Sequence, residues 1–412
     1  MEEHTFRRRG LGLRGVDSDR VAPGYVLYAP LTSNTAHLVS TSGEEVHRWT
    51  LPHRAGRHAR ILPNGNLAYN AAHPNSPNLF PMWKKYCGGV MMQVDPEGDV
   101  VRKYEDPHAH HDQNHLDDGT LLYTTLEPLT VEEAARVRGG IPGSEAPDGK
   151  VYADCIKLVD PWSTSNESSS SDFEEKPGTG NKTTNGGAKL LWSWRAIDHL
   201  DVTKFTQHQD YPREHWPLIN SVSLDSNGDI IASSRNTSSV FIISRATGDV
   251  IWHLTAPTVN QQHCAHEINP NTGDLLILDN GVFRPGLAVP FSRAVIVSRE
   301  TKQITWEYKD TTTGGLGFFT PFMGSAHKLA GTGNVLIAEA ATGRIFEVTV
   351  DGDVVWEFVV PQVNDYRGVM SGQELGEMEK IGFSYASNAV FRAYKYSEGE
   401  VPWLAEKKIK GQ

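Results

Sequence analysis

Two turn motifs alternate along this chain, and their recurrence limits the fold more than any other feature of the sequence. In the first, a glycine-centred turn leads into an apolar run, as in NGNLAY from Asn64 and NGDIIA from Asn227. In the second, a turn leads into a β-rich run that ends in an aromatic residue. The aromatic positions lie 50 to 58 residues apart, except for one interval of 90, and they are Trp49, Tyr104, Trp194, Trp252, Trp306 and Trp356. A period of this length is typical of propellers and solenoids, in which each repeat is one supersecondary unit.

Each repeat has room for four short strands separated by turns, and there are six repeats. This pattern predicts an all-β, six-bladed β-propeller with four-stranded blades. The first repeat lacks its leading strand, and we expect the C-terminal run NAVFRAYKY (388–396) to supply it and close the ring. We therefore predict one propeller domain over residues 24–412, preceded by an N-terminal tail over residues 1–23. The Ser-rich stretch at about 162–187 has almost no aliphatic residues and is expected to be a disordered surface insertion.

Composition narrows the class of partner. The formal charge is −11 and the basic residues are scattered, apart from the run Arg7-Arg8-Arg9, so a nucleic-acid partner is not expected. The chain has no apolar leader and no apolar stretch long enough to span a membrane, which predicts a cytoplasmic protein without a membrane partner. Three cysteines in a chain of 412 residues do not indicate a disulfide framework.

Histidines recur just before the glycine turns, where the first strand of each blade would begin. The first strand lies nearest the propeller axis, so these side chains are expected to converge on one funnel. Imidazoles in such a funnel suit acid-base or nucleophilic catalysis near neutral pH. We take as candidate substrate-binding residues His58, His111, His115, Asn220, Arg235 and His266, and as candidate catalytic residues His215, His263, Arg293 and His327.

A metal site and a cofactor are not expected from these patterns. The HAHHDQNH stretch that ends at His115 fits no standard zinc spacing and has no cysteine partner. Cys264 lies beside His263, but adjacent residues of a strand face opposite sides, so a Cys/His nucleophile pair is not expected either. A metal at the histidine cluster remains the weaker alternative.

Longer motifs resemble those of a known family. The runs INSVSLDSNGDIIASSRNTSSVFIISRATGDVIWHL from Ile219, QQHCAHEINPNTGDLLILDNG from Gln261 and SRAVIV from Ser292 resemble the fungal branch of the arylsulfotransferase (ASST) family. The resemblance extends over residues 24–396 and implies a six-bladed propeller. It also implies sulfuryl transfer from an aryl sulfate to a phenol, without a nucleotide donor, through a sulfurylated histidine.

Carried over to this sequence, the resemblance assigns three roles. His263 matches the histidine of the family's Gln-His motif and would act as acid/base or charge stabiliser, Arg293 matches its Ser-Arg arginine and would clamp an anion, and His327 would be the nucleophile. Two positions depart from the family, because Leu218 and Asn236 stand where histidines are expected. His215, three residues before Leu218, would compensate only with a rearranged loop.

The repeat pattern, the histidines and the family resemblance together leave three hypotheses for the function. The leading one is an ASST-like enzyme acting on an aromatic or phenolic small molecule. The first alternative, which Leu218 motivates, is a cyclase, lyase or isomerase of secondary metabolism that uses the funnel histidines for proton transfer. The second alternative is a propeller that binds a ligand without catalysis.

Overall fold

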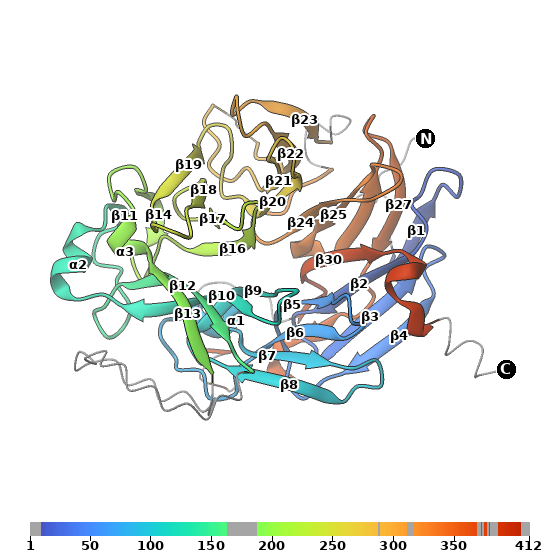
Figure 1. Cartoon of the computed structure of the whole chain (residues 1–412), viewed down its shortest axis with the longest axis horizontal. Coiled ribbons are helices and arrows are strands. Elements are labelled where there is room, and N and C mark those ends of the chain that lie inside the picture. Colours follow the sequence, from blue (N-terminus) through green and yellow to red (C-terminus); the bar gives the residue numbers. More distant parts are fainter. Residues whose placement is uncertain are drawn as a thin grey trace.

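Six antiparallel sheets form a ring around a central axis in the computed structural model of the chain (Figure 1), which confirms the predicted propeller. The structure describes residues 10–162, 188–286, 289–310, 317–368 and 386–404, together with residues 372, 375, 376 and 379. Most of the predicted insertion, residues 163–187, lies outside this part of the chain, so its expected disorder stays a prediction. None of the helices in the described part of the chain is long and apolar enough to cross a bilayer.

Each blade is named by its strands from the axis outward. Blade 1 has β30 (Val390–Tyr396), β2 (Tyr25–Pro30), β3 (Thr35–Ser40) and β4 (Glu45–Thr50); blade 2 has β5 (Ala55–Ile61), β6 (Leu67–Ala72), β7 (Gly89–Val94) and β8 (Val100–Glu105); blade 3 has β9 (Ala109–His115), β10 (Leu121–Pro128), β12 (Tyr152–Asp160) and β13 (Lys189–Arg195). Blade 4 has β16 (Ile219–Leu224), β17 (Ile230–Ser234), β18 (Ser239–Ile243) and β19 (Val250–Thr255); blade 5 has β20 (His263–Asn269), β21 (Asp274–Asp279), β22 (Arg293–Val297) and β23 (Ile304–Tyr308); blade 6 has β24 (Ser325–Lys328), β25 (Val335–Glu339), β26 (Arg344–Val348) and β27 (Val354–Val359).

The C-terminal strand closes the ring as predicted. β30 pairs antiparallel with β2, with Tyr396 opposite Tyr25, and becomes the inner strand of blade 1. The N-terminal boundary differs from the prediction, because β1 (Gly12–Val16) lies within the stretch assigned to a tail. It pairs with β27 and adds a fifth strand to the outer edge of blade 6. Backbone pairing at that edge orders residues 12–16, although their sequence shows little apolar alternation.

The recurring aromatic residues hold neighbouring blades together. The indole Nε1 of each fourth-strand tryptophan donates a hydrogen bond of 2.8–3.0 Å to a backbone carbonyl in the last turn of an adjacent blade. The pairs are Trp49 with Asp95, Trp194 with Gly248, Trp252 with Arg299, Trp306 with Val350 and Trp356 with Thr41. In blade 2 the aromatic residue is Tyr104, whose hydroxyl lies 3.3 Å from that of Tyr123 in blade 3. The sequence period therefore reflects blade-to-blade packing.

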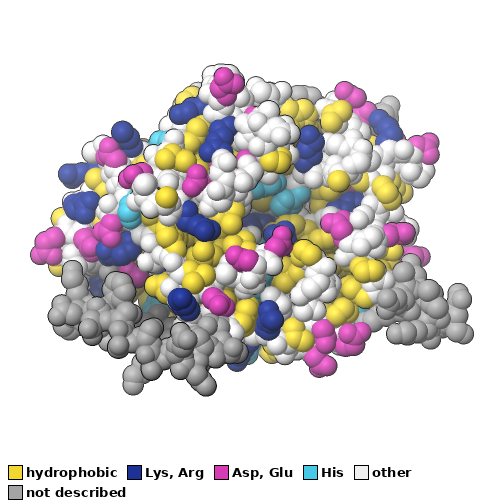
Figure 2. Space-filling model, in the orientation of Figure 1, with side chains coloured by type: hydrophobic (Ala, Val, Ile, Leu, Met, Phe, Trp, Pro, Cys, Tyr) yellow, Lys and Arg dark blue, Asp and Glu magenta, His cyan; other side chains and the backbone are white. Residues whose placement is uncertain are grey.

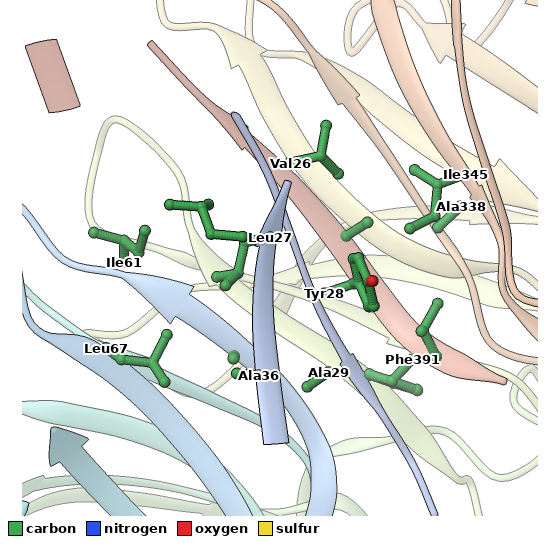
Figure 3. Packing of buried hydrophobic residues seen from close by; sticks show 14 of the residues in the cluster. Val26, Leu27, Tyr28, Ala29, Ala36, Ile61, Leu67, Ala338, Ile345 and Phe391 are labelled. Atoms are coloured by element: carbon green, nitrogen blue, oxygen red, sulfur yellow. The ribbon is translucent and has the colours of Figure 1, made fainter. Parts of the chain in front are cut away.

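Apolar side chains fill the space between blades. Strands such as β2 are buried along their whole length, and successive residues face opposite neighbours. Figure 3 shows Leu27 directed toward Ile61 and Leu67 of blade 2, while Val26 lies on the side of Ala338 and Ile345 of blade 6; the region belongs to the largest hydrophobic cluster of the described residues. This packing fixes the position of each inner strand relative to the axis.

Polar side chains meet at the axis itself. The six inner strands, β30, β5, β9, β16, β20 and β24, lie next to one another around it. Figure 2 shows histidine and basic side chains in the hollowed middle of one face. Deeper in, Asp112 of β9 accepts two hydrogen bonds from the Arg392 guanidinium of β30, at 2.9 and 2.8 Å, and one from Val222 N of β16; His58 Nε2 of β5 lies 2.9 Å from the same carboxylate. This carboxylate therefore ties four inner strands together.

We expect Asp112→Asn to lower the free energy of unfolding by about 3–5 kcal/mol, because Arg392 is left buried without its counter-charge. The double variant Asp112→Leu with Arg392→Met removes both charges and should recover part of that loss. Urea denaturation of both variants checks this. Arg20→Ala, which breaks an exposed ion pair with Asp353, is the control and should cost no more than about 1 kcal/mol. An Asp112→Asn protein as stable as this control would contradict the central role of Asp112.

Candidate functional site

Two cavities lie at opposite ends of the inner strands. The first has a volume of about 280 Å³ and its lining includes residues from the first halves of these strands, such as His111 and His263. The second has a volume of about 260 Å³ and is lined by residues further along the same strands, such as Asp112 and His266. The single funnel predicted from the sequence is therefore two cavities.

The candidate residues are divided between these cavities. The first cavity is lined by His111, His215, Arg235 and His263, with Leu218 and Asn236, and the second by His266 and His327. His58 and Asn220 are buried at the axis, where His58 contacts Asp112 and the Asn220 carbonyl accepts from Arg392. His115 lies in neither cavity and contacts Gln93 and Gln113.

Arg293 does not reach the axis, which corrects its expected role as an anion clamp. It stands at the start of β22, the third strand of blade 5, and lines neither cavity. Its guanidinium is engaged by Asp279 at 2.8 Å, by Glu307 at 2.5 Å and by the carbonyl of Thr258 at 2.9 Å. These partners occupy the donors that an anionic substrate would need, so Arg293 is a structural residue of its blade.

His327 and His263 are also separated, contrary to the expectation that they act together. His327 lies in the second cavity, with its Nε2 3.8 Å from Cys264 Sγ. His263 lines the first cavity, but both of its nitrogens are engaged. Nδ1 lies 2.7 Å from Asn280 Oδ1, and Nε2 accepts from the backbone N–H of Met323 at 3.2 Å. Burial lowers the pKa of His263 to about 3, so it is a neutral wall residue.

A buried aspartate supports two chains of hydrogen-bonding side chains. Asp154 of β12 lies 3.2 Å from His215 Nε2, and His215 Nδ1 lies 3.0 Å from the hydroxyl of Tyr86 on the short helix α1 (Trp83–Tyr86). Asp154 also lies 3.0 Å from His110 Nε2. Although burial opposes its ionisation, His215 and His110 hold the pKa of Asp154 at about 2. A permanent carboxylate here orients both imidazoles.

The second chain ends at the wall of the first cavity. His110 Nδ1 lies 2.8 Å from His111 Nδ1. When His110 carries its proton on Nε2, toward Asp154, its Nδ1 accepts from His111 Nδ1–H. The lone pair of His111 is then on Nε2, which makes no hydrogen bond with a described residue. Burial, followed by repulsion from Arg57, lowers the pKa of His111 well below 6.5 and keeps the ring neutral.

Two arginines that line the same cavity form no ion pair with a described carboxylate, and a lysine lies beside them. Arg57 of β5 is 3% exposed and donates to the Lys85 carbonyl at 3.2 Å, and no described carboxylate pairs with it. Burial lowers the pKa of Arg57 to about 9. Arg235 lies over the Tyr211 ring at 4.6 Å from its centroid and forms no ion pair with a described residue. Burial, with repulsion from Arg57, also lowers the pKa of Lys85 to about 7.

One acidic side chain of the cavity titrates near neutrality. Burial raises the pKa of Glu214, the residue before His215, to about 7. Apolar side chains complete the walls, among them Met82, Leu218 and Phe322. The site thus combines a positive charge, a neutral imidazole and an acid-base group around an apolar space, which is a catalytic pattern.

Six of these residues were not among the sequence-based candidates, namely Arg57, Lys85, Tyr86, His110, Asp154 and Glu214. Three of them carried a signal, because Arg57 precedes His58 on an inner strand, His110 precedes His111 and Glu214 precedes His215. The other three do not lie on inner strands. Lys85 and Tyr86 reach the cavity from the connection between β6 and β7, and Asp154 of a third strand contacts His215 and His110 behind the cavity wall.

Two clusters of described side chains have donor atoms close enough for a metal ion. His110, Asp154 and His215 form one, and Cys264, His266 and His327 form the other, with all donor atoms of a cluster within 4.8 Å of one another. In the first cluster Asp154 is hydrogen-bonded to His215 and lies within 3.0 Å of His110 Nε2. The second cluster lies in the second cavity.

Residues 75–360 match the family model described as Arylsulfotransferase (ASST). The chain belongs to the arylsulfotransferase family. A search of curated proteins found no match.

Solved structures of distant proteins were also compared. They include a protein of unknown function from Bacteroides caccae (11% identity, TM-score 0.49, 91% of this chain and 99% of that one) and a streptogramin B lyase (12%, 0.42, 86% and 85%). A virginiamycin B lyase from Staphylococcus aureus matches at 11% identity with a TM-score of 0.41, over 86% of each chain. These likenesses are too weak to bear on function.

Glu214 predicts a specific dependence of stability on pH. A carboxyl whose pKa is higher in the folded than in the unfolded chain binds its proton more tightly when folded, so stability falls as the pH rises from 4.5 to about 7. Glu214→Gln removes this loss. Between pH 4.5 and 7 the free energy of unfolding of Glu214→Gln should rise relative to that of the parent by up to about 3 kcal/mol. Solvent in the cavity screens the charge of Glu214 and makes the rise smaller. Denaturant unfolding at a series of pH values measures this rise. Glu300→Gln, at an exposed turn, is the control and should show no such trend. A difference between Glu214→Gln and the parent that does not change with pH would contradict the raised pKa of Glu214.

Proposed function

We propose that the first cavity binds an aromatic anion of the aryl sulfate type and that the protein transfers its sulfuryl group through a histidine. One observation carries this proposal: the Arg57 guanidinium is almost fully buried beside an apolar cavity, and no described carboxylate pairs with it. A buried cation without a counter-ion is costly, and an anionic ligand offsets that cost. Membership of the arylsulfotransferase family supports the same chemistry.

We assign the nucleophile to His111 in place of His327. His111 shares the first cavity with Arg57 and Arg235, its ring is neutral, and the His110–Asp154 pair favours a lone pair on Nε2. In the first step this lone pair attacks sulfur, the bond from sulfur to the aryl oxygen breaks, and the phenolate leaves with a proton from Glu214. The N-sulfurylated imidazolium keeps its Nδ1 proton directed at His110 and Asp154, which stabilises its positive charge.

The second step returns the enzyme to its starting state. An acceptor phenol gives its proton to the Glu214 carboxylate while its oxygen attacks sulfur, and the bond from sulfur to His111 Nε2 breaks. A carboxyl with a pKa of about 7 serves as acid in the first step and base in the second. Arg57 and Arg235 face the charge that builds on the sulfuryl oxygens. The cavity volume suits a substrate with one aromatic ring.

The two missing histidines fit this scheme. Leu218 gives the cavity an apolar wall, and Asn236 donates from Nδ2 to the His215 carbonyl at 3.1 Å. His215, Tyr86 and Arg235 occupy the region that the family's histidines would serve. We place the chain in the fungal branch of the family on the motifs quoted above.

A second candidate function uses the same cavity for proton transfer alone. The Tyr86–His215–Asp154 chain and the titration of Glu214 near neutrality favour it. A lyase or isomerase of this type would need Glu214 and Tyr86 but would form no covalent histidine intermediate. Labelling of the histidine separates the two functions.

Incubation with 4-nitrophenyl sulfate, acid-free digestion and peptide mass spectrometry should find sulfurylated His111. His111→Gln should abolish this label and reduce transfer to a phenol on the order of 10³-fold or more, as for other essential nucleophiles. His253→Gln, at a half-buried histidine of β19 outside both cavities, is the matched control and should keep label and rate. A label on His327 would overturn our assignment in favour of the nucleophile implied by the family resemblance. No label on any histidine would overturn sulfuryl transfer.

The proposed role of Arg57 and Arg235 in holding the anion can be tested by measuring substrate binding. Arg57→Met and Arg235→Met keep much of the side-chain volume but remove the charge, and each should weaken binding of 4-nitrophenyl sulfate by roughly 10- to 150-fold, since a hydrogen bond to a charged group contributes about 1.5–3 kcal/mol. Arg48→Met, on the exposed face of β4, should bind like the parent. Calorimetry or competition binding measures the change. A loss in Arg293→Lys with none in Arg57→Met would place the anion site elsewhere.

A further inference from the structure

We propose that the second cavity holds a zinc-class divalent ion bound by Cys264, His266 and His327, with a fourth position open to the cavity. The three donor atoms lie within 4.8 Å of one another. Thiolate and imidazole are the ligands that zinc prefers, and a site with three protein ligands leaves one position for water or another small ligand. The cavity of about 260 Å³ next to these residues provides that space.

The distances are close to those of a bound state. In a tetrahedral zinc site the metal lies about 2.3 Å from sulfur and about 2.0–2.1 Å from nitrogen, so ligand sulfur and nitrogen are about 3.5 Å apart. Cys264 Sγ lies 3.8 Å from His327 Nε2, and the ring centroids of His266 and His327 are 5.0 Å apart. Small side-chain rotations therefore complete the site without movement of the strands.

The three proposed ligands come from two neighbouring inner strands, one of which has an irregular backbone. Cys264 and His266 come from β20 and both line the second cavity, and His327 comes from the neighbouring inner strand β24. The pairing of β20 with β21 is irregular between His263 and His266, and Cys264 has a positive φ of 54°. Non-glycine residues in such strained conformations cluster at functional sites.

The surroundings of the two imidazoles suit metal ligation. His266 Nδ1 lies 3.3 Å from the Cys264 carbonyl, so Nδ1–H donates there and Nε2 keeps a lone pair for the metal. Ligating histidines commonly make such a bond with their second nitrogen. His327 is stacked on Tyr394, with ring centroids 4.6 Å apart, which fixes its ring plane.

The charges near the site permit a cation. Of the basic residues lining the cavity, Arg392 is paired with Asp112 and Lys395 with Glu347. Arg60 and Lys328 are exposed and screened by solvent. On binding, the metal takes Cys264 as thiolate and the thiol proton leaves to solvent, which adds a negative charge to the site. An anion site without a metal would make no use of the cysteine.

The test uses the full chain freed of metal by chelator dialysis and titrated with Co²⁺, then with Zn²⁺. We expect one Co²⁺ per chain, with the intense visible bands of tetrahedral cobalt and a thiolate charge-transfer band, both lost on displacement by Zn²⁺. Cys264→Ser should remove the charge-transfer band and weaken binding by more than the 10- to 100-fold that loss of an outer-shell partner costs. His327→Gln should also weaken binding.

Cys155→Ser, at a buried cysteine of β12 outside both cavities, is the matched control and should leave the spectrum unchanged. Circular dichroism and thermal unfolding of each variant establish that it is folded. The proposal is overturned if folded protein binds no stoichiometric Co²⁺, if the thiolate band persists in Cys264→Ser, or if sulfate alone stabilises the metal-free protein while Co²⁺ does not bind. None of these residues takes part in the proposed transfer at the first cavity, so the two proposals fail independently.

Discussion

The ion pair between Asp112 and Arg392 is the interaction on which the rest of the molecule depends. The blades are held to one another by apolar packing and by indole-to-carbonyl hydrogen bonds, but these act away from the axis. At the axis the inner strands present polar groups to one another, and a buried charge is tolerated only when it is paired and hydrogen-bonded. Asp112 meets this requirement with bonds to β30 and β16 and contact with His58 of β5, and so joins the closing C-terminal strand to the opposite side of the ring.

The inner strands contribute to two cavities of different chemistry. On β9 His111 lines the first cavity and Asp112 the second, and on β20 the neighbours His263 and Cys264 are divided in the same way. In the first cavity Arg57 and Arg235 have no described carboxylate partner, and Glu214 lies with them against apolar walls. The second has a thiol and two imidazoles among basic residues that are either paired or exposed. This difference is why we propose separate occupants for the two cavities.

The sequence predicted the architecture well because the architecture is periodic. Each Trp bonds to an adjacent blade in the same way, so the spacing of Trp194, Trp252 and Trp306 reports the blade repeat directly. Ring closure by the C-terminal strand followed from a missing strand in the first repeat. The site was predicted only in part, because the repeat locates inner strands but not what other elements bring to them. Tyr86 comes from a helix in a connection, and Asp154 from a third strand, and neither position has a periodic signal.

Arg293 shows the physical reason why matching a motif is not enough to assign a role. In its motif it would be an anion clamp, yet Asp279 and Glu307 occupy its donors, and a guanidinium that is already neutralised gains little from a further anion. Arg57 has the opposite balance: it is buried, its pKa is lowered to about 9, and no described carboxylate offsets its charge. The proposed binding of an anion therefore rests on Arg57, and the proposed nucleophile has to lie within reach of it. His111 lines the same cavity as Arg57, whereas His327 lines the second cavity together with Asp112 and Arg392.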